Sequence, residues 1–75
     1  MTPADTSRGI AATVSAALRD AGISQRDAAA RTGIAINTLS RRLTGNSPFL
    51  VTELALIAEL LDTTIEHLIA PERAA

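Results

Sequence analysis

The side chains best suited to chemistry lie in the segment TGIAINTLSRRLTG, residues 32–45. This segment holds the only two adjacent arginines of the chain, Arg41 and Arg42, close to Asn37 and Ser40. Arginine can donate two hydrogen bonds to guanine, and asparagine can pair with adenine through two atoms. These residue types, spaced for one side of a short helix, indicate the reading of base edges in double-stranded DNA.

Catalysis and metal binding find no support in the residue inventory. The chain has no cysteine and one histidine, His67, so it offers no set of metal ligands. Asp62, His67 and serines are the residue types of a catalytic triad, but nothing in the sequence indicates that they converge. We therefore expect no enzymatic activity, no metal and no cofactor, and no small-molecule ligand is evident. The longest aliphatic run, Leu54 to Ala58, is far too short to span a bilayer. Without a secretory signal either, the expected location is the cytoplasm.

The formal net charge of −1 conceals a strong gradient along the chain. Residues 24–47 contain four arginines and one aspartate, whereas residues 48–75 contain five acidic residues and one arginine. Phosphate would repel the acidic part, which should therefore point away from DNA. The basic middle third is the part expected to bind it.

Apolar spacing and helix-capping residues predict an all-α fold of five short helices in a single domain, residues 1–75. The residues at both ends, 1–5 and 71–75, are expected to fray. The first predicted helix is capped by Asp5 or Thr6 and ends near Ala21. The second covers 25–32 and is capped by Ser24, and the third covers about 36–44. The fourth starts between Leu50 and Glu53, and the fifth is capped by Thr63 or Thr64 and stopped by Pro71.

Helices two and three are separated by a short segment around Gly33, which is the spacing of a helix-turn-helix. Leu39 and Leu43 are one turn apart and should face the core. The opposite side of the third helix is then exposed, and it consists of Ile36, Asn37, Ser40, Arg41 and Thr44.

The stretch ISQRDAAARTGIAINTLSRRLTGNSPFLVTELALIAELLDTTIEHLIA, residues 23–70, resembles the lambda-repressor-like helix-turn-helix family, also called Cro/CI or XRE. The matching pieces are SQ at the start of helix two, AAARTGI through the turn, NTLSRRLTG in the third helix and ELALIAELLDTTIEHLI in the last two. The resemblance implies a compact five-helix bundle that binds double-stranded DNA as a dimer, with helix three in the major groove.

The resemblance also suggests roles for single residues. Base contacts fall at Ile36, Asn37 and Arg41, to which we add Ser40. Ile36 either contacts a thymine methyl group or packs on the protein itself. Phosphate contacts are expected at Gln25, Arg26, Thr38, Arg42, Thr44, Asn46 and Ser47. Arg42 has an alternative, an ion pair with a carboxylate of helix four or five. Many family members carry glutamate where this chain has Leu43.

Apolar residues near the C-terminus leave the oligomeric state open. Each belongs either to the monomer core or to a dimer contact, and they are Leu60, Ile65, Leu68 and Ile69. The predicted function is that of a phage or mobile-element repressor. It is expected to bind a two-fold operator as a homodimer, which forms either in free solution or only on DNA. The alternative is an antitoxin or adaptor that uses the same bundle to bind a protein.

Overall fold

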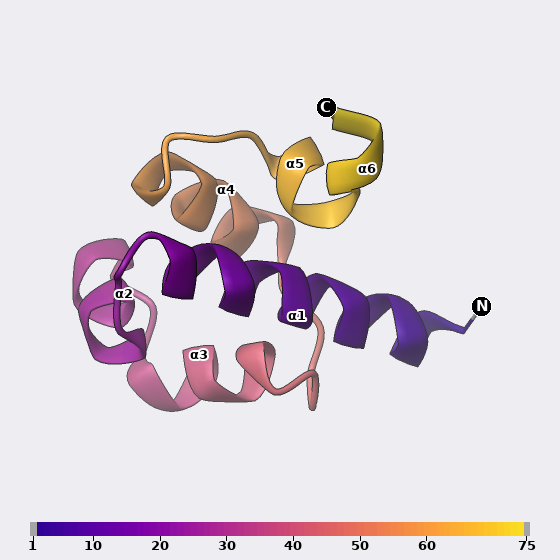
Figure 1. Cartoon of the computed structure of the whole chain (residues 1–75). Helices are drawn as coiled ribbons and strands as arrows, with labels where there is room; N and C mark the ends of the chain where they lie inside the picture. Colours follow the sequence, from indigo (N-terminus) through magenta and orange to yellow (C-terminus); the bar gives the residue numbers. More distant parts are fainter. Residues whose placement is uncertain (1, 75) are drawn as a thin grey trace.

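The computed structural model describes residues 2–74, which form six α-helices and no strand (Figure 1). The helices are α1 (Pro3–Asp20), α2 (Gln25–Thr32), α3 (Ile36–Leu43), α4 (Val51–Leu60), α5 (Ile65–Ile69) and α6 (Pro71–Ala74). The first five correspond to the predicted helices, and α6 is one additional turn. None of the helices in this range is long and apolar enough to cross a membrane. The predicted all-α bundle is confirmed.

Helix α1 runs through the middle of the molecule and organises the others around it (Figure 1). It contacts α3 on one side and α5 on the other, while α2 packs against both α3 and α4. In the view of Figure 1, α3 lies below α1, and α4, α5 and α6 lie above it. The third helix therefore occupies one side of the bundle by itself.

A single apolar core holds these helices together. Its largest fully buried side chains are Val14, Leu39, Ile57 and Leu68, so α1, α3, α4 and α5 each supply one of them. Helix α2 contributes two small buried residues at 28 and 29, both alanine, which allow neighbouring helices to approach closely. The core is aliphatic, as expected from a chain with one aromatic residue.

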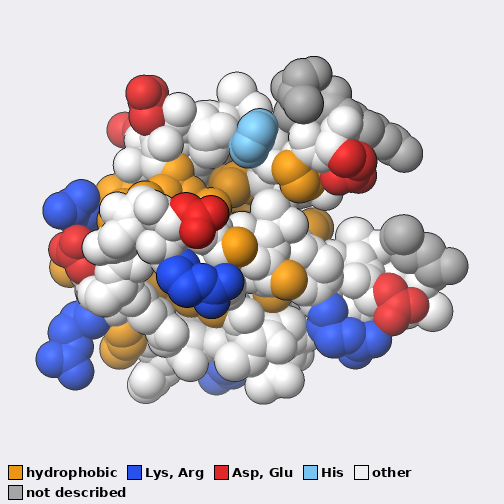
Figure 2. All heavy atoms as spheres, viewed as in Figure 1, with side chains coloured by type: hydrophobic (Ala, Val, Ile, Leu, Met, Phe, Trp, Pro, Cys, Tyr) orange, Lys and Arg blue, Asp and Glu red, His pale blue; other side chains and the backbone are white. Residues whose placement is uncertain are grey.

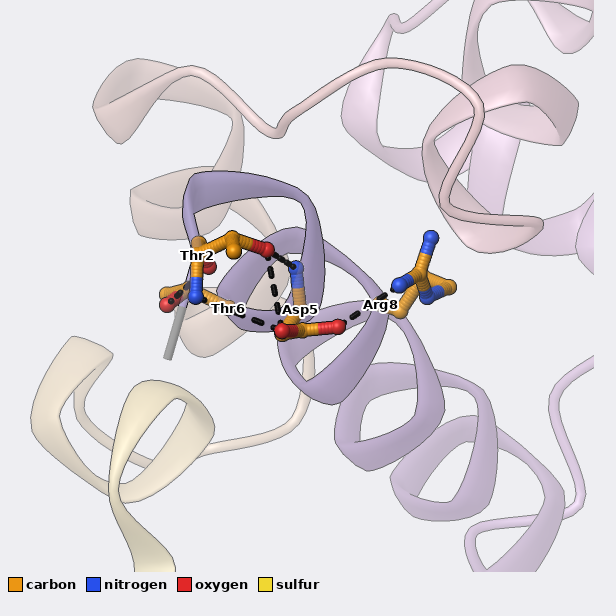
Figure 3. Close-up of polar contacts among 4 residues, drawn as sticks. All are labelled: Thr2, Asp5, Thr6 and Arg8. Carbon is orange, nitrogen blue, oxygen red and sulfur yellow. Dashed lines mark hydrogen bonds and ion pairs between the residues drawn. The ribbon is translucent and has the colours of Figure 1, made fainter.

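The start of α1 differs from the prediction, because Thr2 and not Asp5 or Thr6 caps the helix (Figure 3). The Thr2 hydroxyl accepts a hydrogen bond from the Asp5 amide at 3.1 Å, and the Asp5 carboxylate accepts from the Thr2 amide at 3.3 Å. Pro3 occupies the first helical position, where its missing N–H leaves no bond unmade. Asp5 is thus the third residue of a capping box, and it also pairs with Arg8 at 2.7 Å.

The C-terminal end also differs from the prediction. Helix α5 starts after Thr64, whose hydroxyl accepts from the His67 amide at 3.2 Å, and it ends at Ile69. Helix α5 ends before Pro71, as predicted, but Pro71 also begins α6, since proline suits the first turn of a helix. Residues 3–5 and 71–74, expected to fray, are helical here, and positions 1 and 75 lie outside the described residues.

Candidate nucleic-acid interface

The turn between α2 and α3 is formed by a glycine in the left-handed conformation. Gly33 has φ of 78°, and its amide donates to the Ala29 carbonyl oxygen at 3.0 Å, which closes α2. Ile34 follows and is buried in the core, so the turn is fixed from inside. Two eight-residue helices are thereby held across a three-residue connection, as the helix-turn-helix prediction requires.

Ser24 caps the start of α2, as predicted, but only one of the two hydrogen bonds of a capping box is formed there. The Ser24 hydroxyl accepts from the Asp27 amide at 3.1 Å, as expected. The reciprocal hydrogen bond, in which the Ser24 amide would donate to the Asp27 carboxylate, is not found in the described part of the chain. The carboxylate lies instead 3.3 Å from Arg31, one turn further along α2. This pair is exposed, and Arg31 is therefore a partnered surface residue beside the candidate interface.

Helix α3 has two contrasting sides. Leu39 is fully buried and Leu43 half-buried, which confirms the predicted inward side. On the other side Ile36 is 43% exposed, and Asn37 is exposed as well. The remaining members of the predicted outward stripe lie on this same side, Ser40 half-buried and Arg41 and Thr44 exposed. No other segment of the bundle covers this side of the helix in Figure 1, where it faces down.

Arg41 is the principal charged side chain of this surface. It is exposed, and no carboxylate in residues 2–72 forms a salt bridge with it. Its backbone oxygen accepts from the Thr44 hydroxyl and from the Asn46 amide, each at 3.1 Å. These bonds close the end of α3 and leave the guanidinium group itself available for a ligand.

Arg42 points the other way and forms an ion pair with Glu53 of α4. Its Nε donates to Glu53 Oε1 at 2.8 Å, and a terminal nitrogen donates to Oε2 at 3.2 Å. The two side chains are only 15% and 11% exposed. Of the two roles considered for Arg42, the structure shows the ion pair, in which the guanidinium group is bound inside the protein. A phosphate contact by Arg42 stays a prediction.

Glu53 is the only charged residue that is buried in the described part of the chain. Burial raises the pKa of its carboxyl, but hydrogen bonds from Arg42 and the Leu50 amide, together with the Arg42 charge, outweigh it and hold the pKa below its ordinary value. Sequence reasoning missed this role for Glu53. The signal was its place as the third residue of a helix that follows an extended Leu50, where a carboxylate accepts the free amide at 2.9 Å.

The predicted phosphate contacts occupy different surroundings. Ser47 is half-buried, and its hydroxyl oxygen accepts from Arg42 at 2.8 Å, so that oxygen serves the ion-pair cluster. Thr38 is half-buried on α3. The remaining predicted contacts are exposed side chains at the start of α2 and after α3, namely Gln25, Arg26, Thr44 and Asn46.

A groove of about 420 Å³ lies beside these residues, between the end of α1 and the end of α3. Gln25 and Thr44 line it together with Arg19, an exposed arginine for which no role was predicted. No described carboxylate forms a salt bridge with Arg19. Its place in the last turn of α1, just before the chain enters α2, is the feature of the sequence that could have indicated Arg19 as a DNA contact.

Charges segregate between the two parts of the bundle. Figure 2 shows arginine and acidic side chains together over α1 and α2, whereas the part formed by α4, α5 and α6 shows acidic side chains and the histidine on this face. Helix α3 itself carries two arginines and no acidic residue. Exposed carboxylates of the latter part are Glu59, Asp62, Glu66 and Glu72. The α3 side is therefore the side of the molecule that can approach a polyanion at the lowest electrostatic cost.

The candidate dimer residues do not form one surface. Leu68 is fully buried in the monomer core, so its assignment as a dimer contact is wrong. Leu60 and Ile65 are half-buried against the same core, and Ile69 is 46% exposed. Other exposed apolar side chains, which were not predicted, lie at the start and middle of α4, at Leu50, Val51 and Leu56.

An all-helical bundle whose second and third helices meet across a left-handed glycine, with a polar side of the third left open, defines a helix-turn-helix protein. A family model described as Helix-turn-helix matches residues 14–68, and the chain belongs to this family, in its lambda-repressor-like form. No curated protein and no solved structure matches the chain significantly. The family is one of DNA-binding regulators whose domain is not catalytic, which identifies this chain as a DNA-binding regulator.

Proposed function

We propose that this protein is a transcriptional repressor of phage or mobile-element type that binds a specific double-stranded DNA sequence as a homodimer. The observation that supports this most is the outward side of α3, where Arg41 carries no intramolecular ion pair among the described residues. Such a helix fits the major groove, where each base pair presents a distinct set of donors and acceptors. Repression then follows from occupying a promoter in the cytoplasm.

The outward side chains divide the work of recognition. Arg41 bonds the two acceptors of a guanine, Asn37 pairs with an adenine, and Ile36 contacts a thymine methyl group. Ser40 adds a hydroxyl at the edge of this set. Phosphate contacts from the start of α2 and the loop after α3 fix the position of the domain on the duplex without reading sequence.

A dimer follows from the small number of positive charges that one copy offers. The logarithm of the binding constant falls with the logarithm of the salt concentration by about 0.9 for each phosphate neutralised. One domain with few free arginines neutralises few phosphates and therefore binds weakly. Two copies related by a two-fold axis present their α3 helices to half-sites about 34 Å apart. The acidic α4–α6 part then points away from the duplex.

The test is a selection from random duplex DNA at two salt concentrations, followed by affinity measurements on the selected site. We expect a motif with two-fold symmetry. Arg41→Ala should weaken binding to it by about 5- to 160-fold, since one guanine contact contributes about 1–3 kcal/mol. The matched control is Arg31→Ala, which removes the same charge from a residue already paired with Asp27 and should change the affinity less than threefold. Equal losses for the two variants would reject base reading by Arg41.

A second candidate, an antitoxin or adaptor that binds a protein, is favoured by one observation. Val51 is 71% exposed and its neighbour Leu50 54% exposed, and apolar surface of this kind is typical of protein contacts. A double variant, Asn37→Ala with Arg41→Ala, separates the two functions. Regulation lost with the DNA contact supports the repressor, and regulation retained without DNA binding supports the adaptor.

A further inference from the structure

We infer that Arg42 and Glu53 are positioning residues for DNA reading, because their ion pair sets the rotation of α3 about its own axis. This inference rests on the proposed function and deepens it. Neither residue needs to touch DNA. Their effect acts through Arg41 and Asn37, which share the helix that the ion pair holds.

The geometry of the pair is directional. All three guanidinium nitrogens of Arg42 are used, two by the Glu53 carboxylate at 2.8 and 3.2 Å and the third by the Ser47 hydroxyl at 2.8 Å. A planar guanidinium bound at both edges has one orientation, unlike an ammonium group or an apolar side chain. The low exposure of both side chains, 15% and 11%, limits competition by water.

Helix α3 has few other directional contacts with the rest of the bundle, and one of them is long, from the Ser15 hydroxyl to the Leu43 carbonyl oxygen at 3.4 Å. It has eight residues, and its N-cap, Ala35, makes no side-chain hydrogen bond. Leu39 is its only fully buried side chain. Leu43, half-buried, packs against the same core. Apolar packing is non-directional, so the two leucines hold α3 against the core, whereas the ion pair adds a contact of defined direction.

The other end of the restraint is firmly placed. Glu53 also accepts a hydrogen bond from the Leu50 amide at 2.9 Å, and it belongs to α4. Three neighbours on the same helix, Leu54, Ile57 and Ala58, are buried in the core. The ion pair therefore fixes the orientation of α3 relative to α4, which is itself held in place by the core.

The consequence for recognition is a matter of distance. Side chains of an α-helix reach about 5–6 Å from its axis, so a roll of about 10° moves their ends by about 1 Å. Groups that recognise a ligand must be held to about 0.5 Å. Loss of the pair should therefore damage base reading while leaving contacts to phosphate, which tolerate such shifts, largely intact.

The experiment compares affinity for the selected operator with affinity for an unrelated duplex of equal length, in four proteins. They are the wild type, Glu53→Gln, the apolar double variant Arg42→Met with Glu53→Leu, and the control double variant Asp27→Asn with Arg31→Met. Thermal unfolding is measured on each, and binding is measured well below every midpoint. The apolar pair should restore stability, because replacing a buried ion pair by apolar residues of similar volume is often neutral.

We expect Glu53→Gln and the apolar double variant to bind the operator at least tenfold more weakly, with less than threefold change on the unrelated duplex. The control variant should stay within threefold on both, since it removes an exposed pair. A stable apolar variant that keeps wild-type operator affinity overturns the inference alone, because the pair then only stabilises the fold. If that variant folds poorly, Glu53→Gln decides instead: wild-type operator affinity in a folded Glu53→Gln protein overturns the inference. A wild type without any preferred duplex overturns the proposed function and this inference with it.

Discussion

Arg41 and Arg42 are adjacent in the sequence, yet their side chains lie on different sides of α3. Arg42 lies 2.8 Å from the Glu53 carboxylate inside the bundle, whereas Arg41 is exposed and makes no salt bridge among the described residues. Successive residues of an α-helix are about 100° apart, so one arginine can join the structure while the other faces outward. A pair of positive charges in a slightly acidic protein thus has two separate purposes, one in folding and one in the proposed contact with DNA.

Ile36 offers a test of whether an apolar side chain reads a base. It is 43% exposed, so Ile36→Ala should lower the free energy of unfolding by less than about 1 kcal/mol. If Ile36 meets a thymine methyl group, the variant should lose the preference for A·T at one position of the selected motif. Leu39→Ala is the control for packing, since Leu39 is fully buried and its loss should cost about 2–5 kcal/mol. A motif unchanged by Ile36→Ala would assign Ile36 to the protein alone.

Arg19 should contribute to DNA binding through phosphate. It lines the groove with Gln25 and Thr44 and makes no salt bridge within the described residues. Arg19→Gln should weaken binding to the operator and to unrelated DNA by similar factors, and it should reduce the salt slope by about one unit per monomer. Arg8→Gln is the control, because Arg8 pairs with Asp5 near the start of α1. Unequal losses on the two duplexes would instead point to base contact by Arg19.

The sequence predicted the parts of this structure that depend on local rules. Leucines one turn apart at 39 and 43 defined the inward side of α3, and Ser24 capped α2 as its hydroxyl and position required. The inner partner of Arg42 could not be chosen, because a long side chain reaches several neighbours and only the packing of α4 brings Glu53 to it. For the same reason Leu68 could not be separated from surface residues, since its burial depends on α1 and α4 together.

Two errors at the helix ends have local causes. Thr2 was overlooked as a cap because Asp5 and Thr6 are themselves good capping residues, and the proline between them and Thr2 decided the register. At the other end, a proline that cannot continue α5 can still begin a new turn. The groove beside Arg19 lies beyond any local rule, because residues of α1, α2 and α3 meet there only after folding.

The glycine turn between α2 and α3 should be sensitive to any side chain. Gly33 has φ of 78°, and a Cβ atom there would meet nothing within 4 Å. Gly33→Ala should therefore cost about 1–2 kcal/mol through the backbone conformation and not through a clash. Gly9→Ala is the matched control, since Gly9 lies inside α1 with equally open space, and it should stabilise the protein by about 0.5–1 kcal/mol. Opposite signs in thermal unfolding are the expected result, and equal effects would contradict it.

The Arg42–Glu53 pair should make the stability of the protein depend on acid. Because the folded state holds the pKa of Glu53 below its ordinary value of 4.5, the ionised carboxyl contributes stability above that pH. That contribution is lost as the pH falls through the lowered pKa of the folded state, where the carboxyl takes up a proton. In Glu53→Gln no proton is taken up at this position, so its free energy of unfolding should vary less between about pH 7 and pH 3.

Chemical denaturation at several pH values measures this difference directly. At neutral pH the Glu53→Gln variant should be less stable than the wild type by about 1–3 kcal/mol, since Arg42 loses its charged partner. The two curves should approach each other as the pH falls below 4.5, because the wild-type carboxyl then also becomes neutral. Asp5, whose pKa is lowered by hydrogen bonds from Thr2 and by Arg8, titrates in both proteins and so cancels in the comparison. Parallel curves with a constant offset would show that the pair stabilises the bundle through packing and not through the charge of Glu53.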